Sequence, residues 1–126
     1  MDEQLRDEVL ATYAAYLKAF LSKDMKTLDS LMQYPLCYIG NGAVRMFDQF
    51  PFDPAAMMAA KQMHTTIDTD IEVVLATANK AHVVLRSATR VKIDGTPIET
   101  VSAFYALTRT DAGWKIFALS DITIPA

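Results

Sequence analysis

The sequence contains little of what several kinds of functional site require. Its 126 residues include one cysteine, two histidines and four glycines. The single cysteine, Cys37, excludes an internal disulfide, and together with two distant histidines it gives no pattern of metal ligands. None of the glycines belongs to a phosphate-binding loop, because no glycine pair introduces a helix. We therefore expect neither a metal ion nor a cofactor.

Positive charge is also sparse. The chain carries 12 lysines and arginines against 15 aspartates and glutamates, for a net charge of −3, and has no basic run. Because binding to nucleic-acid phosphates needs clustered positive charge, we expect no nucleic-acid partner. The apolar stretches are too short to span a bilayer, and the acidic, amphipathic start MDEQLRDEVL is atypical of a secretory signal. With the lone cysteine, these features predict a cytoplasmic protein without a membrane segment.

The chain is rich in apolar residues, and these recur in regular patterns. Hydrophobic residues make up 52% of the sequence, which is enough for one globular domain over residues 1–126. Apolar residues recur at helical spacing over 5–21, and Ser22 or Asp24 can cap a second helix through Met32. Asp53-Pro54 begins a third helix that reaches about His64. Between the last two helices we expect a short strand over 36–39 and an irregular, mobile loop over 43–53.

The second half of the chain has the composition of β-strands. Runs rich in valine, isoleucine and threonine cover residues 65–76, 81–93, 100–109 and 114–124. Asp94-Gly95 is a typical hairpin turn between the second and third of these runs. Helices followed by consecutive strands predict an α+β protein, with the helices on one face of a mainly antiparallel sheet.

Three segments also resemble a known superfamily. They are YLKAFLSKD over 16–24, MKTLDSLM over 25–32 and GWKIFALSDI over 113–122. Their order and spacing resemble the nuclear transport factor 2-like superfamily, which includes SnoaL-like and ketosteroid-isomerase-like proteins. The resemblance implies a cone, in which three N-terminal helices pack on the concave face of a curved sheet around an apolar pocket. Isomerases, cyclases, dehydratases, epoxide hydrolases and non-catalytic binding domains share this fold, so the fold alone does not determine the function.

Simple alternation along the strands assigns side chains to the two faces of the sheet. Because burying isolated guanidinium groups is costly, we place Arg86 and Arg90 outside and Leu85 and Ser87 inside. The same alternation places Ser102, Phe104, Ala106, Phe117, Leu119 and Asp121 inside. It leaves an apolar outer surface formed by Ala88, Val101, Ala103, Tyr105 and Leu107. Such a surface predicts a homodimer through the outer sheet face. A β-bulge would reverse part of this assignment.

The resemblance also implies positions for catalytic groups. Tyr16 corresponds to the tyrosine with which ketosteroid isomerases stabilise a developing enolate, so its phenol could act as an oxyanion donor. The general-base aspartate of that family corresponds here to Gly40, and its second oxyanion donor to Phe104. Neither residue can take over the missing role, so steroid isomerisation is not expected.

Two other residues could transfer protons. Asp121 lies on the last strand among apolar residues, and His64 ends the third helix near the expected cavity mouth. Each has a structural alternative: Tyr16 in the core, Asp121 paired with a tyrosine, serine or arginine, and His64 interacting with the helix dipole. Further residues expected to line the pocket are Tyr13, Phe20, Tyr38, Phe50, Met58, Ser87, Phe104, Phe117 and Leu119.

Three functional hypotheses follow. The favoured one is a small-molecule-binding protein whose apolar pocket holds a small apolar ligand. The alternative is a polyketide-cyclase-like, dehydratase-like or isomerase-like enzyme, with Asp121 or His64 as acid or base and Tyr16 as oxyanion donor. In the third, the cone is filled by its own phenylalanine and methionine side chains.

Overall fold

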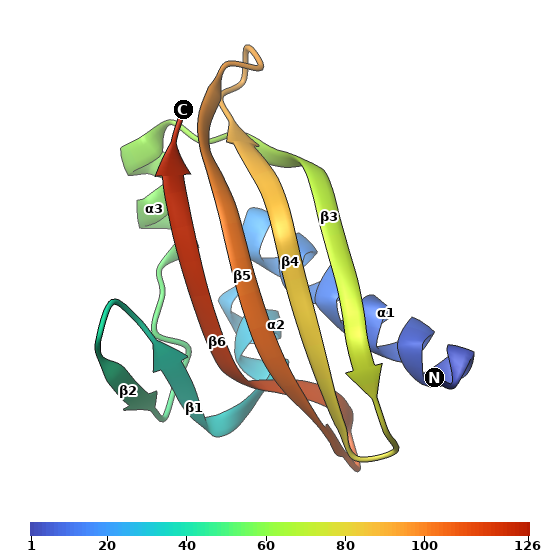
Figure 1. Cartoon of the computed structure of the whole chain (residues 1–126). Helices are drawn as coiled ribbons and strands as arrows, with labels where there is room; N and C mark the ends of the chain where they lie inside the picture. The colour runs from blue at the N-terminus through green and yellow to red at the C-terminus, as the bar shows by residue number, and fades with distance from the viewer.

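The computed structural model describes all residues, 1–126, as three helices and a six-stranded sheet (Figure 1). In chain order the elements are α1 (Glu3–Leu21), α2 (Met25–Ser30), β1 (Met32–Ile39), β2 (Val44–Phe47), α3 (Pro54–Lys61), β3 (Thr65–Ala76), β4 (Lys80–Val91), β5 (Pro97–Thr110) and β6 (Gly113–Pro125). No helix is both long and apolar enough to cross a membrane.

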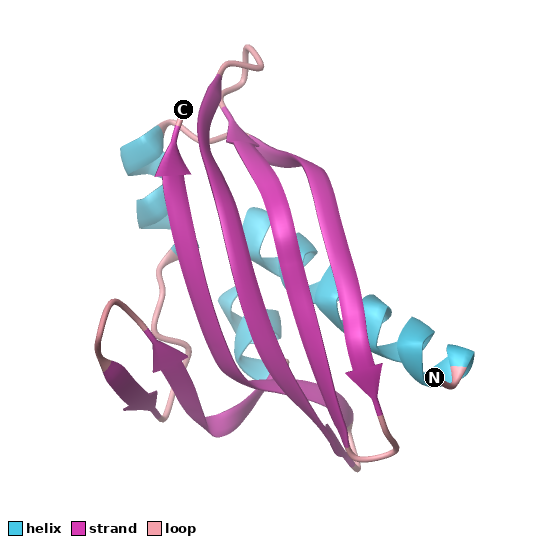
Figure 2. Cartoon of the chain, viewed as in Figure 1, coloured by secondary structure: helices cyan, strands magenta, loops and turns pink.

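The sheet has the strand order β2-β1-β6-β5-β4-β3. Only β1 and β6 are parallel, and every other neighbouring pair is antiparallel. Helices α1 and α2 lie behind the sheet in the view of Figures 1 and 2, and α3 lies at its edge near the C-terminus. The face turned to the viewer carries no helix. The α+β cone architecture predicted from the sequence is confirmed.

Aspartate caps determine where the helices begin. Asp2 accepts hydrogen bonds from the backbone N–H groups of Gln4 and Leu5 and so caps α1. Asp24 and Asp53 cap α2 and α3 in the same way, with Pro54 in the first turn of α3. The predicted starts of the second and third helices therefore agree with the structure, but α3 ends at Lys61, before the predicted end near His64.

The segment after α2 differs from the prediction. α2 ends at Ser30, and Met32 already pairs with Ile116 of β6, so β1 begins well before residue 36. Pro35 lies inside β1, after a cis peptide bond. The segment 43–53 is not wholly irregular either, because β2 forms a hairpin with β1 across Gly42, whose φ of 72° suits a tight turn.

The core lies between α1 and the concave face of the sheet. The buried face of α1 contributes Val9, Tyr13, Tyr16, Ala19 and Phe20. From the sheet, Leu107 and Ile116 are each only 1% exposed. This apolar contact between one helix and the sheet encloses the interior of the cone.

Irregular strand pairing corrects the predicted faces. The register of β4 against β5 shifts between Leu85 and Ala88, and both of these residues are buried. The extra residue turns Arg90 to the inside, where simple alternation had placed it outside. A second shift, in β5 and β6 between Ala106 and Leu107, leaves Ile116 and Leu119 buried and Phe117 half-buried.

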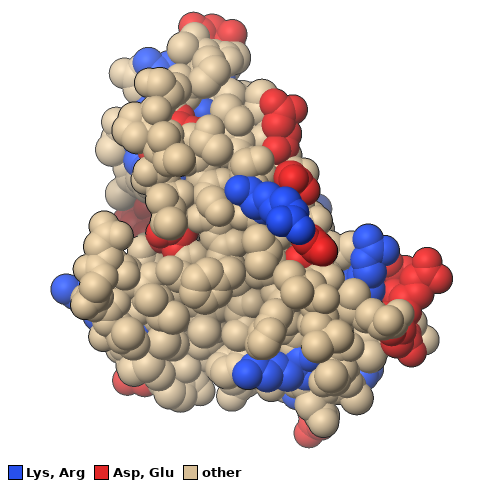
Figure 3. Space-filling model, in the orientation of Figure 1, with Lys and Arg blue, Asp and Glu red and all other residues tan.

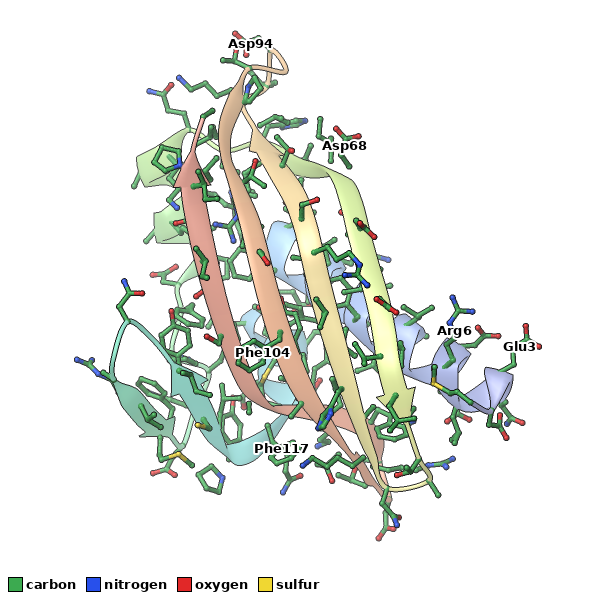
Figure 4. The ribbon with its side chains drawn as sticks, in the orientation of Figure 1. Glu3, Arg6, Asp68, Asp94, Phe104 and Phe117 are labelled. Atoms are coloured by element: carbon green, nitrogen blue, oxygen red, sulfur yellow. The ribbon has the colours of Figure 1, made fainter.

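The prediction of which residues form the outer surface is therefore wrong. Every one of them is buried on the concave side: Ala88, Val101, Ala103, Tyr105 and Leu107. The outer face instead exposes Phe104 and Ile124, at 49% and 63%. Figure 4 labels Phe104 and Phe117 on the helix-free side, and Figure 3 shows that charged side chains are sparse over most of it.

Two leucine substitutions on this sheet test the corrected faces. Leu107→Ala should lower the free energy of unfolding by about 2–5 kcal/mol, because it leaves a cavity in the core. The matched control Leu75→Ala, at a side chain that is 55% exposed, should cost less than about 0.5 kcal/mol. Urea unfolding followed by circular dichroism measures both values. Equal effects at the two positions would contradict the assignment of Leu107 to the inside.

Candidate functional site

A cavity of about 410 Å³ lies between α1 and the concave face of the sheet. Its walls come from α1, from β4 to β6, and from the segments around β1 and α3. Most of the lining is apolar or aromatic: Tyr13, Tyr16, Leu17, Phe20, Tyr38, Phe52, Met57, Met63, Leu85, Ala88, Val101, Tyr105, Leu119 and Ile122. The polar lining consists of Asn41, Lys61, Thr66, Arg90, Asp121 and Thr123, with Gly40 at one edge.

Tyr16 lies in a cluster of aromatic rings. Its ring centroid is 6.1 Å from that of Tyr13, 5.9 Å from Tyr105, 6.2 Å from Phe20 and 6.4 Å from Phe50. These tilted and edge-on contacts hold the ring in place. Burial, followed by the nearby Tyr13 phenol and then the negative charge of Asp121, raises the pKa of Tyr16 well above its usual range, so the phenol keeps its proton.

The hydroxyl of Tyr16 is available to a ligand. It takes part in no hydrogen bond within the chain, although every fully buried polar side-chain atom of the protein has a partner. The hydroxyl therefore opens onto the cavity that the residue lines. A neutral phenol in this position can donate a hydrogen bond to a carbonyl or hydroxyl oxygen.

Asp121 and Tyr38 form a second polar feature of the wall. The Tyr38 hydroxyl donates a hydrogen bond of 2.7 Å to Oδ1 of Asp121, from β1 to the adjacent strand β6. This hydrogen bond, followed by burial, raises the pKa of Tyr38 to about 12. The Tyr38 ring also packs edge-on against Phe52, at 5.1 Å between centroids. Asp121 forms no ion pair, so its carboxylate remains in the cavity wall as a hydrogen-bond acceptor.

A charged cluster forms a third feature, which the sequence did not lead us to expect. Arg90 Nη1 and Lys61 Nζ each lie 2.6 Å from the same oxygen, Oε2 of Glu99. The Glu99 side chain is 10% exposed, Arg90 14% and Lys61 32%. Burial alone would raise the pKa of Glu99, but the hydrogen bonds from Lys61 and Arg90 outweigh it, and the pKa lies below its ordinary value.

Sequence reasoning missed this cluster because it treated Arg90 as an isolated charge. A signal was present, since Arg90 and Glu99 lie equally far from the centre of the Asp94-Gly95 turn. Simple hairpin pairing places such residues opposite each other, and the structure pairs Arg90 with Glu99. A paired guanidinium costs far less to bury than a lone one.

The cavity brings together several of the predicted site residues. Tyr16 and Asp121, the two strongest candidates, line the same volume. So do four of the predicted pocket residues: Tyr13, Phe20, Tyr38 and Leu119.

Other predicted site residues lie elsewhere. Ser87 lies at the β4 bulge, and Phe104 and Phe117 are on the outer side, where Lys80 Nζ lies 5.9 Å from the Phe117 ring. Phe50 and Met58 are buried beside the cavity without lining it. Also outside the lining, His64 is exposed, and its backbone N–H donates to the Val91 carbonyl.

Comparison with family models identifies the chain's relatives. A family model described as NTF2-like protein (DUF6841) matches residues 7–121. The chain belongs to this family. NTF2 stands for nuclear transport factor 2, so the match confirms the superfamily inferred from the sequence. Among curated proteins, the comparison found no sequence match.

Solved structures show the same fold at low sequence identity. An NTF2-like protein from Cytophaga hutchinsonii has 19% identity and a TM-score of 0.68, with 98% of this chain and 100% of that chain covered. A protein of the NTF2-like family from Streptomyces avermitilis, proposed to be a dehydratase, has 19% identity and a TM-score of 0.68, with 95% and 96% covered. A cystatin-like-fold protein of unknown function from Nostoc punctiforme has 10% identity and a TM-score of 0.71, with 94% and 90% covered. At these identities the likeness concerns the fold.

The charged cluster makes stability depend on pH in a defined direction. The folded-state pKa of Glu99 lies below its ordinary value of 4.5, so the unfolded chain binds more protons as the solution is acidified. The contribution of the cluster is therefore fully present above that value and is lost as the pH falls through the folded-state pKa. Glu99→Gln should reduce the loss of unfolding free energy between about pH 6 and about pH 3, measured by urea unfolding.

Glu72→Gln is the control, because it breaks an exposed pair with Arg86 on the outer side of the sheet. Such surface pairs contribute little to stability, so this variant should follow the wild-type pH dependence. A Glu99→Gln protein with the wild-type pH dependence would contradict the role assigned to the cluster.

Proposed function

We propose that the protein binds a small, largely apolar molecule in the cavity between α1 and the sheet. The observation that carries the proposal is that the Tyr16 hydroxyl and the Tyr38–Asp121 pair face one volume of about 410 Å³. Ligand sites typically occupy roughly 300–1,000 Å³ and combine apolar walls with a few convergent polar groups. The cavity has both properties.

The aromatic side chains of the 43–53 segment do not favour a cone filled by its own residues. Phe50 and Phe52 pack against each other at 5.6 Å between centroids, and Phe50 also contacts the Tyr16 ring. Phe52 lines one side of the cavity with Phe50 packed beside it, and the volume of the cavity stays open. Phe104, which could also have filled the interior, lies on the outer side of the sheet.

A proton-transfer enzyme is the second candidate. It is favoured because Tyr16 and Asp121 line the same cavity. A substrate carbonyl held by the Tyr16 phenol would develop negative charge while the Asp121 carboxylate accepts a proton from carbon. His64 is exposed and outside the lining, so the acid–base role falls to Asp121 alone. The related protein from Streptomyces avermitilis, proposed to be a dehydratase, is consistent with this chemistry.

Binding is the better supported of the two. The cavity offers one carboxylate and one oxyanion donor, and Gly40 supplies no side chain at the position of the isomerase base. Ligand binding requires only the observed volume and the hydrogen-bonding groups around it. Catalysis additionally requires a substrate that places its reacting carbon within hydrogen-bond range of Asp121.

A ligand screen with a matched pair of valine variants tests the binding proposal. Val101→Phe would place a ring in the cavity and should weaken binding of a screened ligand by about 10-fold or more, because the ligand and the ring compete for space. Val74→Phe, at a side chain that is 51% exposed, should leave the affinity unchanged. Calorimetric titration measures both. Equal affinity in the two variants would place binding outside the cavity.

A homodimer and a cytoplasmic location remain predictions. The exposed apolar residues Phe104 and Ile124, in place of the buried residues predicted from the sequence, are the candidate contact surface on the outer sheet face. Phe104→Glu should shift sedimentation from dimer to monomer, because a charge would be buried at such a contact. A wild-type protein that sediments as a monomer at every concentration would contradict the dimer.

A further inference from the structure

Ligand binding at Tyr16, Tyr38 and Asp121 requires no contribution from the charged cluster of Arg90, Lys61 and Glu99. Both cations line the cavity, and each gives its only side-chain ion pair to the same oxygen of Glu99. An ammonium group carries three N–H donors and a guanidinium five. Most of these donors therefore have no side-chain acceptor within the chain.

Stability alone is a weak explanation for the cluster. Removing three charged groups from water costs several kcal/mol each, and hydrophobic replacements of such clusters are often neutral or stabilising. A cluster used only to hold the β4–β5 hairpin in register would also need no opening to the cavity. Here the two cations are part of the cavity wall, while Glu99, the counter-ion, is not among the lining residues.

The charge of the cluster indicates the charge of a partner. Two cations and one carboxylate leave an excess of one positive charge in a largely apolar wall. A single carboxylate group neutralises this excess and accepts hydrogen bonds from both cations. A phosphate monoester, with its charge close to −2, would remain unbalanced.

The negative charge in the cavity lies away from the cluster. Arg90 is opposite Glu99 in β5, whereas Asp121 is opposite Ala103, which lies four residues further along the same strand. Four residues correspond to about 13 Å along a strand, and β4 and β6 are separated by β5. An anionic group at Arg90 therefore avoids Asp121, which can accept a hydrogen bond from the opposite end of the same ligand.

The charges of both Asp121 and Arg90 act on the phenol of Tyr16. Asp121 raises the pKa of its phenol and Arg90 lowers it, although burial is the dominant cause of the shift. On the sheet side, the apolar residues Leu85, Ala88 and Val101 line the same cavity as Tyr16. The middle of the cavity is therefore suited to an apolar, ring-containing body.

We infer that the cavity selects small hydrophobic carboxylic acids, whose carboxylate binds Arg90 and Lys61 and whose apolar body lies between Tyr16 and the sheet. This inference rests on the proposed function and specifies the chemical class of its ligand. It also gives Arg90 and Lys61 a role in binding, with Glu99 as the positioning residue that holds both cations.

The test uses matched pairs of a carboxylic acid and its neutral amide, measured by calorimetric titration on the full chain. The pairs are phenylacetate, 3-(4-hydroxyphenyl)propanoate, indole-3-acetate and octanoate, each with its amide. We expect the acid of a binding pair to bind about 10- to 100-fold more tightly than the amide, as charge-assisted hydrogen bonds predict. Arg90→Gln should bring this ratio close to one, and Lys61→Gln should lower it.

Arg86→Gln is the matched control, because Arg86 lies on the same strand and forms an exposed pair with Glu72. It should keep the wild-type ratio. Thermal unfolding checks the fold of each variant. If Arg90→Gln fails to fold, Lys61→Gln still tests the inference, because it leaves Glu99 paired with Arg90. A purely structural cluster would change stability in these variants without changing the ratio of acid to amide affinity.

The outcomes separate this inference from the proposed function. Equal affinities for acid and amide, or binding of neutral compounds alone, would overturn the selection of carboxylates and leave small-molecule binding intact. No binding by any acid, amide or other small compound would overturn both. A ratio that survives Arg90→Gln would show that the carboxylate binds elsewhere.

Discussion

The packing of α1 across the concave face of the sheet is the constraint on which the other features depend. Tyr13, Tyr16 and Phe20 project from one side of this helix and meet the inward side chains of β4 to β6. Because the aromatic rings contact one another as well as the sheet, the helix leaves a bounded space at the end of the cone near α3. The cavity and the Tyr16 hydroxyl owe their positions to this contact.

The fold could be predicted from the sequence because its signals are local. Asp24 and Asp53 mark helix starts, and the Asp94-Gly95 turn marks a hairpin, so each element follows from nearby residues. The faces of the sheet could not be predicted in the same way. A bulge after Leu85 depends on pairing between strands, and a single extra residue turns Arg90 and Ala88 from the outside to the inside.

Only part of the candidate site could be predicted from the sequence. Tyr16 and Asp121 were found because the resemblance to a cone-shaped superfamily places their positions near its pocket, and both line the cavity. Lys61 and Arg90 were missed because their burial depends on Glu99, a partner that only the folded register supplies. Burying an isolated charge is costly, but Arg90 is not isolated, because it is paired with Glu99.

The arrangement as a whole favours recognition over chemistry. Four tyrosines and several aliphatic residues surround a volume that has a cationic end and a hydrogen-bond acceptor in another wall. Such a distribution orients an amphipathic molecule through its two ends and its apolar middle. The same distribution gives an enzyme only one carboxylate, Asp121, with which to move a proton.

The measurement that tests this account most directly is a high-resolution crystal structure of the protein as purified, examined for density between Tyr16 and Asp121. The account predicts an open cavity close to 410 Å³ that holds a bound molecule or takes one up from a soak. A cavity closed by the side chains around Tyr16 and Phe52, and unchanged after soaking, would contradict it.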